Sequence, residues 1–62
     1  MELTKEEVTP LIGKNILIIT DKGFTYNCKI LTCGNDYIKI RDKYDTQHFV
    51  MYKKIEILEV LE

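Results

Sequence analysis

The chain of 62 residues is long enough for one domain but too short for a large hydrophobic core, so we expect residues 1–62 to form a single domain. Nine basic and ten acidic residues give a net charge of -1, which argues against the non-specific, phosphate-driven DNA binding of strongly basic domains. A chain of this size removes only about 60% of its unfolded surface from water on folding, so small domains usually need a disulfide, a metal or an oligomer for stability.

The two cysteines predict neither a disulfide nor a metal site. Cys28 and Cys33 are five positions apart in one predicted strand, so we expect them on opposite faces. Five strand steps span roughly 16 Å, too far for a disulfide. A zinc site needs four ligands, which two cysteines and the single His48 do not supply. We expect reduced, structural cysteines, which suit the cytoplasm, and no cofactor.

The beginning of the chain shows no targeting signal. It has no charged region followed by an apolar stretch, and no apolar run reaches about 18 residues. We therefore expect a cytoplasmic protein that associates with no membrane.

The first predicted element is a short N-terminal helix. In Leu3–Val8, the Thr4 hydroxyl and the Glu7 carboxylate are spaced as a capping box, in which each accepts a hydrogen bond from the other's backbone amide. Pro10 limits the helix to one or two turns, and Gly13 releases the chain into extended structure.

Four segments with β-branched or alternating apolar residues follow, bounded by turn residues. They are Asn15–Thr20, Phe24–Ile30, Tyr37–Arg41 and Gln47–Tyr52.

The alternation in these segments predicts which side chains face the core. The first and fourth segments are apolar on both faces, so we expect something to cover their second face. In the third segment Ile38 and Ile40 face inward. The predicted core face of the second segment consists of Phe24, Tyr26, Cys28 and Ile30.

The last segment, Ile55–Glu62, fits two structures. Its glutamates recur at helical spacing, whereas its isoleucines and valine favour a strand, and an eight-residue helix with no cap is weak. We favour a fifth strand, which makes the fold all-β with a short N-terminal helix.

This plan resembles the Sm-like superfamily of SH3-like barrels. The resemblance rests on the capped helix, Gly13-Lys14 before an isoleucine-rich strand, the turn at Asp21–Gly23 and three further short strands. It implies a strongly bent, five-stranded barrel whose copies join edge to edge into rings that bind RNA. The Asp and Asn with which Sm proteins bind RNA are replaced here by Cys33 and Tyr37.

Two groups of aromatic and basic residues are candidate RNA-binding sites. Tyr37, Lys39 and Arg41 share one strand face, which offers a stacking ring with phosphate partners beside it. The alternative is the ordinary solvated face of a half-buried strand. The second group, Tyr52, Lys53 and Lys54, is similar to the Tyr-Lys-His motif of the Hfq-like family. Its alternative is a strand end with a solvated turn.

Catalysis needs a nucleophile, a base and an orienting group that converge in one pocket. We expect no such convergence in this chain, so we predict a non-catalytic binding module. One hypothesis is a homo-oligomer that binds single-stranded RNA. The alternative is a protein-interaction or assembly module with a protein partner and no nucleic-acid role.

Overall fold

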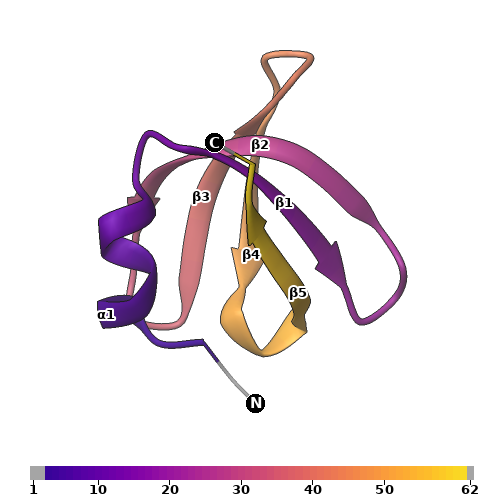
Figure 1. Cartoon of the computed structure of the whole chain (residues 1–62). Coiled ribbons are helices and arrows are strands. Elements are labelled where there is room, and N and C mark those ends of the chain that lie inside the picture. The colour runs from indigo at the N-terminus through magenta and orange to yellow at the C-terminus, as the bar shows by residue number, and fades with distance from the viewer. Residues whose placement is uncertain (1–2, 62) are drawn as a thin grey trace.

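The computed structural model describes residues 3–61, which form a five-stranded antiparallel sheet with one short helix (Figure 1). The helix α1 (Lys5–Val8) runs into a 3-10 turn, η1 (Thr9–Leu11). The strands are β1 (Asn15–Thr20), β2 (Thr25–Cys33), β3 (Tyr37–Asp42), β4 (Gln47–Met51) and β5 (Ile55–Val60), with a second 3-10 turn, η2 (Tyr52–Lys54), before β5. The predicted all-β fold is confirmed.

The short helix is built as its sequence predicts. The Thr4 amide donates to Glu7 Oε1 at 3.1 Å, and the Glu7 amide donates to Thr4 Oγ1 at 3.3 Å, which completes the capping box. Pro10 lies in η1, where the α-helix has already ended. Val8 is fully buried, so α1 covers one end of the curled sheet (Figure 1).

The sheet is strongly bent and stays open at its edges. The strand order is β4-β3-β2-β1-β5, and the register shifts between Ile19 and Thr20 and between Ile30 and Thr32. Such bulges sharpen the local twist. Figure 1 shows β2 curving around the molecule, while η2 connects the two edge strands. No ladder joins β4 to β5 within residues 3–61, so the barrel is open.

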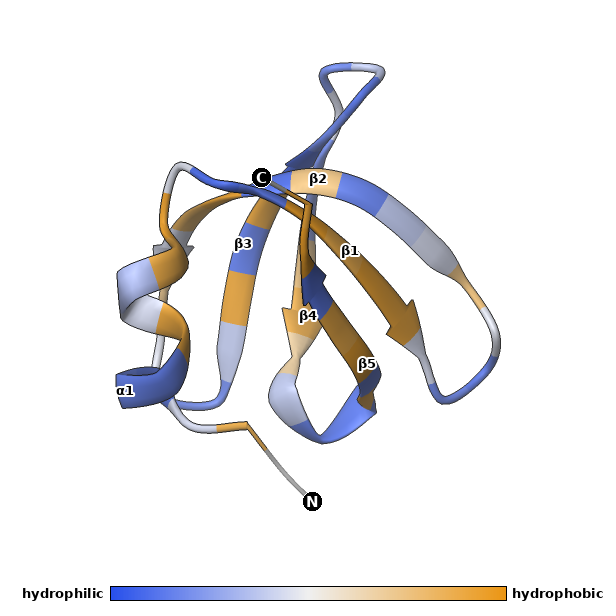
Figure 2. Cartoon of the chain, viewed as in Figure 1, coloured by the Kyte–Doolittle hydropathy of each residue, from blue (hydrophilic) through white to orange (hydrophobic). Residues whose placement is uncertain are grey.

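Isoleucines supply most of the core, as the alternation predicts. Side chains with less than 2% exposure are Val8, Ile16, Ile18, Ile30, Ile38 and Ile40. The second face of β1 is half-buried at Leu17 and Ile19, and Figure 2 shows β1 as a mostly hydrophobic strand, whereas hydrophilic residues interrupt β5. The tip of the β3–β4 hairpin is hydrophilic.

Phe24 lies outside the core, so this part of the prediction is wrong. Its side chain is 61% exposed, and β2 begins one residue later. The Thr20 amide donates to the Phe24 carbonyl at 2.9 Å, and Gly23 has a φ of 85°. Phe24 therefore closes the β1–β2 turn, beyond the part of the sheet that encloses the core.

The two cysteines lie on the same face of β2, against the prediction. The bulge after Ile30 adds a residue, which reverses the alternation beyond it. Cys33 consequently pairs with Ile38 and packs against the core, to which the buried Cys28 also belongs. Cys28 and Cys33 are both free thiols.

The strands on either side of η2 are β4 and β5. β4 ends at Met51, one residue earlier than predicted. The predicted fifth strand is confirmed over Ile55–Val60, while Glu62 lies outside the described residues.

Tyr52 ties η2 to the β2–β3 turn. Its ring is 2% exposed, and its Oη donates to the Gly34 carbonyl at 2.7 Å. The Tyr52 amide donates to the Asp36 carbonyl at 3.0 Å. One side chain and its backbone therefore connect two segments that are far apart in the sequence.

We expect Tyr52→Phe to lower the free energy of unfolding by about 1 kcal/mol, because the Gly34 carbonyl loses a donor in a part-buried site. Urea unfolding followed by circular dichroism measures the change. The control is Tyr44→Phe, since Tyr44 is 76% exposed and should tolerate the change. Equal stability of both variants and the parent would contradict a structural role for this hydrogen bond.

Candidate nucleic-acid interface

The outer face of the β3–β4 hairpin combines aromatic and basic side chains. Tyr37 pairs with Met51, Lys39 with Phe49, and Arg41 with Gln47. Paired residues in neighbouring strands share a face. Because Ile38 and Ile40 face the core, these pairs face outward. We call this face the aromatic–basic surface; its residues are Tyr37, Lys39, Arg41, Phe49 and Met51.

Two rings of this surface contact each other. The Tyr37 and Phe49 centroids are 5.4 Å apart at 67°, an edge-to-face arrangement. Lys39 Nζ lies 5.7 Å from the centroid of the Phe49 ring. The exposed fractions are 41% for Tyr37 and 67% for Phe49. Both rings are thus accessible to a ligand while neighbouring side chains limit their orientations.

The Tyr37 ring also rests on the β2–β3 turn. A Cβ built on Gly34 would lie 2.5 Å from this ring, so only a glycine leaves room for it in this position. The Gly34 carbonyl accepts the hydrogen bond from Tyr52. The turn that supports Tyr37 is therefore itself held by the core.

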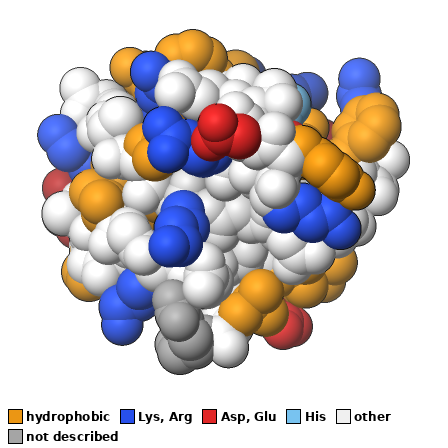
Figure 3. Space-filling view, turned by 90° about the horizontal axis from the view of Figure 1, so that it is seen from above, with side chains coloured by type: hydrophobic (Ala, Val, Ile, Leu, Met, Phe, Trp, Pro, Cys, Tyr) orange, Lys and Arg blue, Asp and Glu red, His pale blue; other side chains and the backbone are white. Residues whose placement is uncertain are grey.

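The positive charges of this face are accessible. Arg41 Nε lies 3.3 Å from Asp45 Oδ1, and both side chains are largely exposed. Exposed ion pairs contribute about 0–1 kcal/mol, so a phosphate can replace Asp45 at little cost. Lys29 of β2 pairs with Arg41 and extends the charge. Figure 3 views the molecule from above, the end at which the tip of the β3–β4 hairpin lies, and shows basic and hydrophobic side chains interspersed, with few acidic ones.

The second predicted group does not form one surface. Tyr52 faces the core, so its predicted role as an exposed stacking ring is wrong. Burial, and next the nearby Cys33, raise the pKa of its phenol. Lys53 and Lys54 are exposed, and Lys54 Nζ lies 4.0 Å from Asp21 Oδ2. The Tyr52 ring is therefore a structural residue.

Sequence reasoning missed Phe49 and Met51 as site residues. The fourth segment is apolar on both faces, and this pattern does not reveal which face is outside. Pairing with β3 decides it: Ile38 lies opposite Val50, which is buried. The outer face of β4 could have been predicted by continuing the alternation of β3 through the hairpin into β4.

A polar cluster lies at the other end of β3. The Asp42 carboxylate accepts hydrogen bonds from the Tyr44 and Thr46 amides, each at 2.9 Å, and lies 2.9 Å from His48 Nε2. The Thr46 hydrogen bond, and next the His48 contact, lower the pKa of Asp42. The His48 ring lies 5.1 Å from that of Tyr26, which connects β4 to β2 across the bent sheet. The cluster therefore supports the fold of the hairpin.

Cys28 is close to this cluster but is a poor nucleophile. Burial, and next the charge of Asp42, raise the pKa of the Cys28 thiol to about 11. The thiol is therefore protonated at neutral pH, whereas the thiolate is the reactive form. Among the side chains of residues 3–61, no three His, Cys, Asp or Glu are grouped to hold a metal ion.

Comparisons of the chain with protein-family models, curated proteins and solved structures found no match. Within the described part of the chain, no helix has the length and apolarity needed to span a membrane.

We expect the protein to be less stable in acid, partly because the Asp42 carboxylate becomes protonated. The ordinary pKa of 3.8 applies to the unfolded chain, and the folded pKa is lower. The stabilisation is therefore complete above the unfolded pKa and is lost as the pH falls through the folded one. We expect Asp42→Asn to flatten the acid side of a plot of unfolding midpoint against pH.

The control for this measurement is Asp45→Asn. Asp45 is 84% exposed in its side chain, and asparagine tolerates its positive φ of 66°. The control should keep the slope of the parent protein. If Asp42→Asn keeps the acid slope of the parent protein, Asp42 does not contribute to the loss of stability in acid.

Proposed function

We propose that the protein is a non-catalytic binding module for single-stranded RNA and that it binds through the aromatic–basic surface. The observation that supports this proposal is the pair of exposed rings, Tyr37 and Phe49, with Lys39 beside them. Unpaired bases stack on aromatic rings, and cations along the same face contact the phosphates. This surface offers both on neighbouring strands.

An ordinary solvated strand face is polar, whereas this face also carries exposed apolar side chains. Phe49 and Met51 are exposed apolar side chains that alternate with the buried Val50. Leaving a phenylalanine ring in water forgoes roughly 1.5–3 kcal/mol of burial, which a stacked base recovers in part. The exposed rings therefore support a ligand more than the basic residues alone do.

The low net charge affects how strongly binding should depend on salt. A chain with a net charge of -1 attracts nucleic acid weakly over long distances, so stacking supplies much of the affinity. Binding should then weaken only moderately with salt. The resemblance to the Sm-like superfamily supports RNA binding, and free thiols are typical of cytoplasmic proteins.

Tyr37→Ala combined with Lys39→Ala should reduce binding to short oligo-U and oligo-A by about tenfold or more, because a stacked base contributes about 1–3 kcal/mol. Phe49→Ala alone should weaken binding in the same direction. Fluorescence anisotropy with labelled oligonucleotides at two salt concentrations measures both. Each variant should keep its fold, because the substituted side chains point away from Ile38 and Ile40.

Two matched variants test the chemistry of this surface. Tyr37→Phe with Lys39→Arg keeps the ring and the charge and should preserve binding. Lys5→Ala with Lys14→Ala removes two exposed charges from the helix and from the segment before β1, and should change binding little. The RNA proposal fails if the parent protein shows no binding at micromolar concentration in low salt.

A second candidate function is assembly, and the sheet edges support it. The strand order ends at β4 on one side and β5 on the other, so each of these strands has one edge with no pairing partner among residues 3–61. Both carry exposed apolar side chains: Met51 at 43%, Ile57 at 44% and Val60 at 42%. Unprotected edges pair readily with another chain, and pairing of unlike edges generates rings. A homo-oligomer is compatible with RNA binding or can exist without it.

Light scattering should report a particle of several chains. Val60→Lys places a charge on the β5 edge and should shift the protein toward monomers. Thr25→Lys makes a similar charge change on an exposed position of β2, which is paired on both sides, and should leave the assembly intact. A monodisperse monomer at all concentrations would exclude the assembly function.

A further inference from the structure

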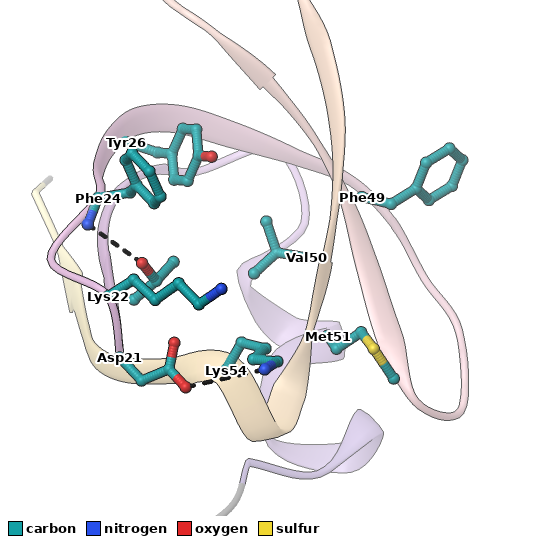
Figure 4. Close-up of a pocket in the computed structure, with 9 residues that line it drawn as sticks. Asp21, Lys22, Phe24, Tyr26, Phe49, Val50, Met51 and Lys54 are labelled. Atoms are coloured by element: carbon teal, nitrogen blue, oxygen red, sulfur yellow. Dashed lines mark hydrogen bonds and ion pairs between the residues drawn. The ribbon is translucent and has the colours of Figure 1, made fainter.

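A hollow of about 230 Å³ opens between the β1–β2 turn, β4 and η2 (Figure 4). Phe24 and Tyr26 form one wall, and Val50 points into the hollow from the opposite side. Phe49 and Met51 also line the hollow, but their side chains are directed away from it. The hollow is therefore separate from the aromatic–basic surface, which lies on the other side of β4.

Backbone hydrogen bonds hold the rim of the hollow in place. The Phe24 amide donates to Thr20 Oγ1 at 3.1 Å, and the Thr20 amide donates to the Phe24 carbonyl at 2.9 Å. The Asp21 amide donates to the Lys54 carbonyl at 2.8 Å, which links the turn to η2. A ligand thus meets walls that are already in position, as in most small-molecule sites.

Two lysines supply positive charge to the hollow. Figure 4 shows the Lys22 side chain running across it toward Val50, and Lys54 lies at its lower rim. Lys54 Nζ is 4.0 Å from Asp21 Oδ2, whereas no carboxylate of residues 3–61 forms an ion pair with Lys22. The hollow therefore has two ammonium groups and one carboxylate, an excess that favours an anionic ligand.

The walls and the charges select for a ligand with a flat ring and a phosphate. Phe24 is 61% exposed, so its ring has a free face against which a planar group can stack. Sites that enclose a drug-sized ligand usually measure about 300–1,000 Å³, so this hollow holds one ring and leaves its substituents at the rim. A phosphate monoester has three oxygens that accept hydrogen bonds and nearly two negative charges, so it can contact both lysines.

We infer that this hollow binds a nucleoside monophosphate unit, with the base against Phe24 and Tyr26 and the phosphate between Lys22 and Lys54. The unit comes from a free nucleotide or from the phosphorylated end of a strand. The inference does not rest on the proposed RNA function, because it uses other residues on another face.

Titration of ¹⁵N-labelled protein with AMP and UMP tests the inference. Both nucleotides should shift the amide signals of Lys22, Phe24 and Val50. Adenosine supplies only the ring and inorganic phosphate only the charge, so each should bind more weakly than AMP. The inference is overturned if AMP shifts no signals, or shifts only those of the aromatic–basic surface.

Variants separate the hollow from non-specific binding. Phe24→Ala should weaken AMP binding by about fivefold or more, the loss expected when a stacking ring is removed. Lys22→Ala should weaken AMP but not adenosine. Tyr44→Ala and Lys53→Ala remove an exposed ring and an exposed lysine that do not line the hollow, so they should have no effect. Equal losses in these controls would overturn the inference.

A 5′-phosphorylated oligo-A distinguishes the two sources of the ligand. It is titrated into the variant Tyr37→Ala with Lys39→Ala, so that the aromatic–basic surface does not contribute. Stronger binding than AMP at the hollow assigns the site to strand ends, and weaker binding assigns it to free nucleotides. Failure of the RNA proposal leaves the AMP result unchanged, so the two proposals fail separately.

Discussion

The burial of Ile38 and Ile40 in β3 is the constraint on which the proposed interface depends. Both side chains have 0% exposure, and burying an isoleucine fully contributes roughly 1.5–3 kcal/mol. A shift of β3 by one residue would exchange the two faces, exposing both isoleucines and burying Lys39. The core therefore determines which face Tyr37 and Lys39 occupy, and any exposed surface on β3 and β4 follows from that packing.

The bending of the sheet determines the positions of Cys33, of the turn after β2 and of the sheet edges. The bulge after Ile30 brings Cys33 onto the core face, and the Tyr52 hydrogen bond holds the turn that follows. The chain then crosses from β4 to β5 through η2 without pairing these strands within residues 3–61. The open side explains two features together, since it leaves both edges unpaired and it contains the hollow between the β1–β2 turn and β4.

Local patterns predicted the elements well, but the sites depend on pairing between distant segments. The capping box, the β-branched run of β1 and the alternation in β3 act within a few residues, so the helix and these strands were predictable. The bulge that turns Cys33 inward depends on β3, and the exposure of Phe24 depends on how its turn closes. The shared face of Tyr37, Lys39 and Arg41 was predictable because one strand carries them. Phe49 was missed because its face is set by β3.

Assembly and RNA binding would reinforce each other in this fold. Phe49 and Met51 lie on β4, an edge strand, so the aromatic–basic surface extends to the border of the chain. An oligomer that pairs this edge with β5 of a second copy repeats the surface at regular intervals. A single strand of RNA that contacts several copies gains affinity through effective concentration, without new contacts in any one copy. In such an oligomer, repetition would offset the weak long-range attraction of a nearly neutral chain, and the proposed RNA binding would then depend on the strand edges.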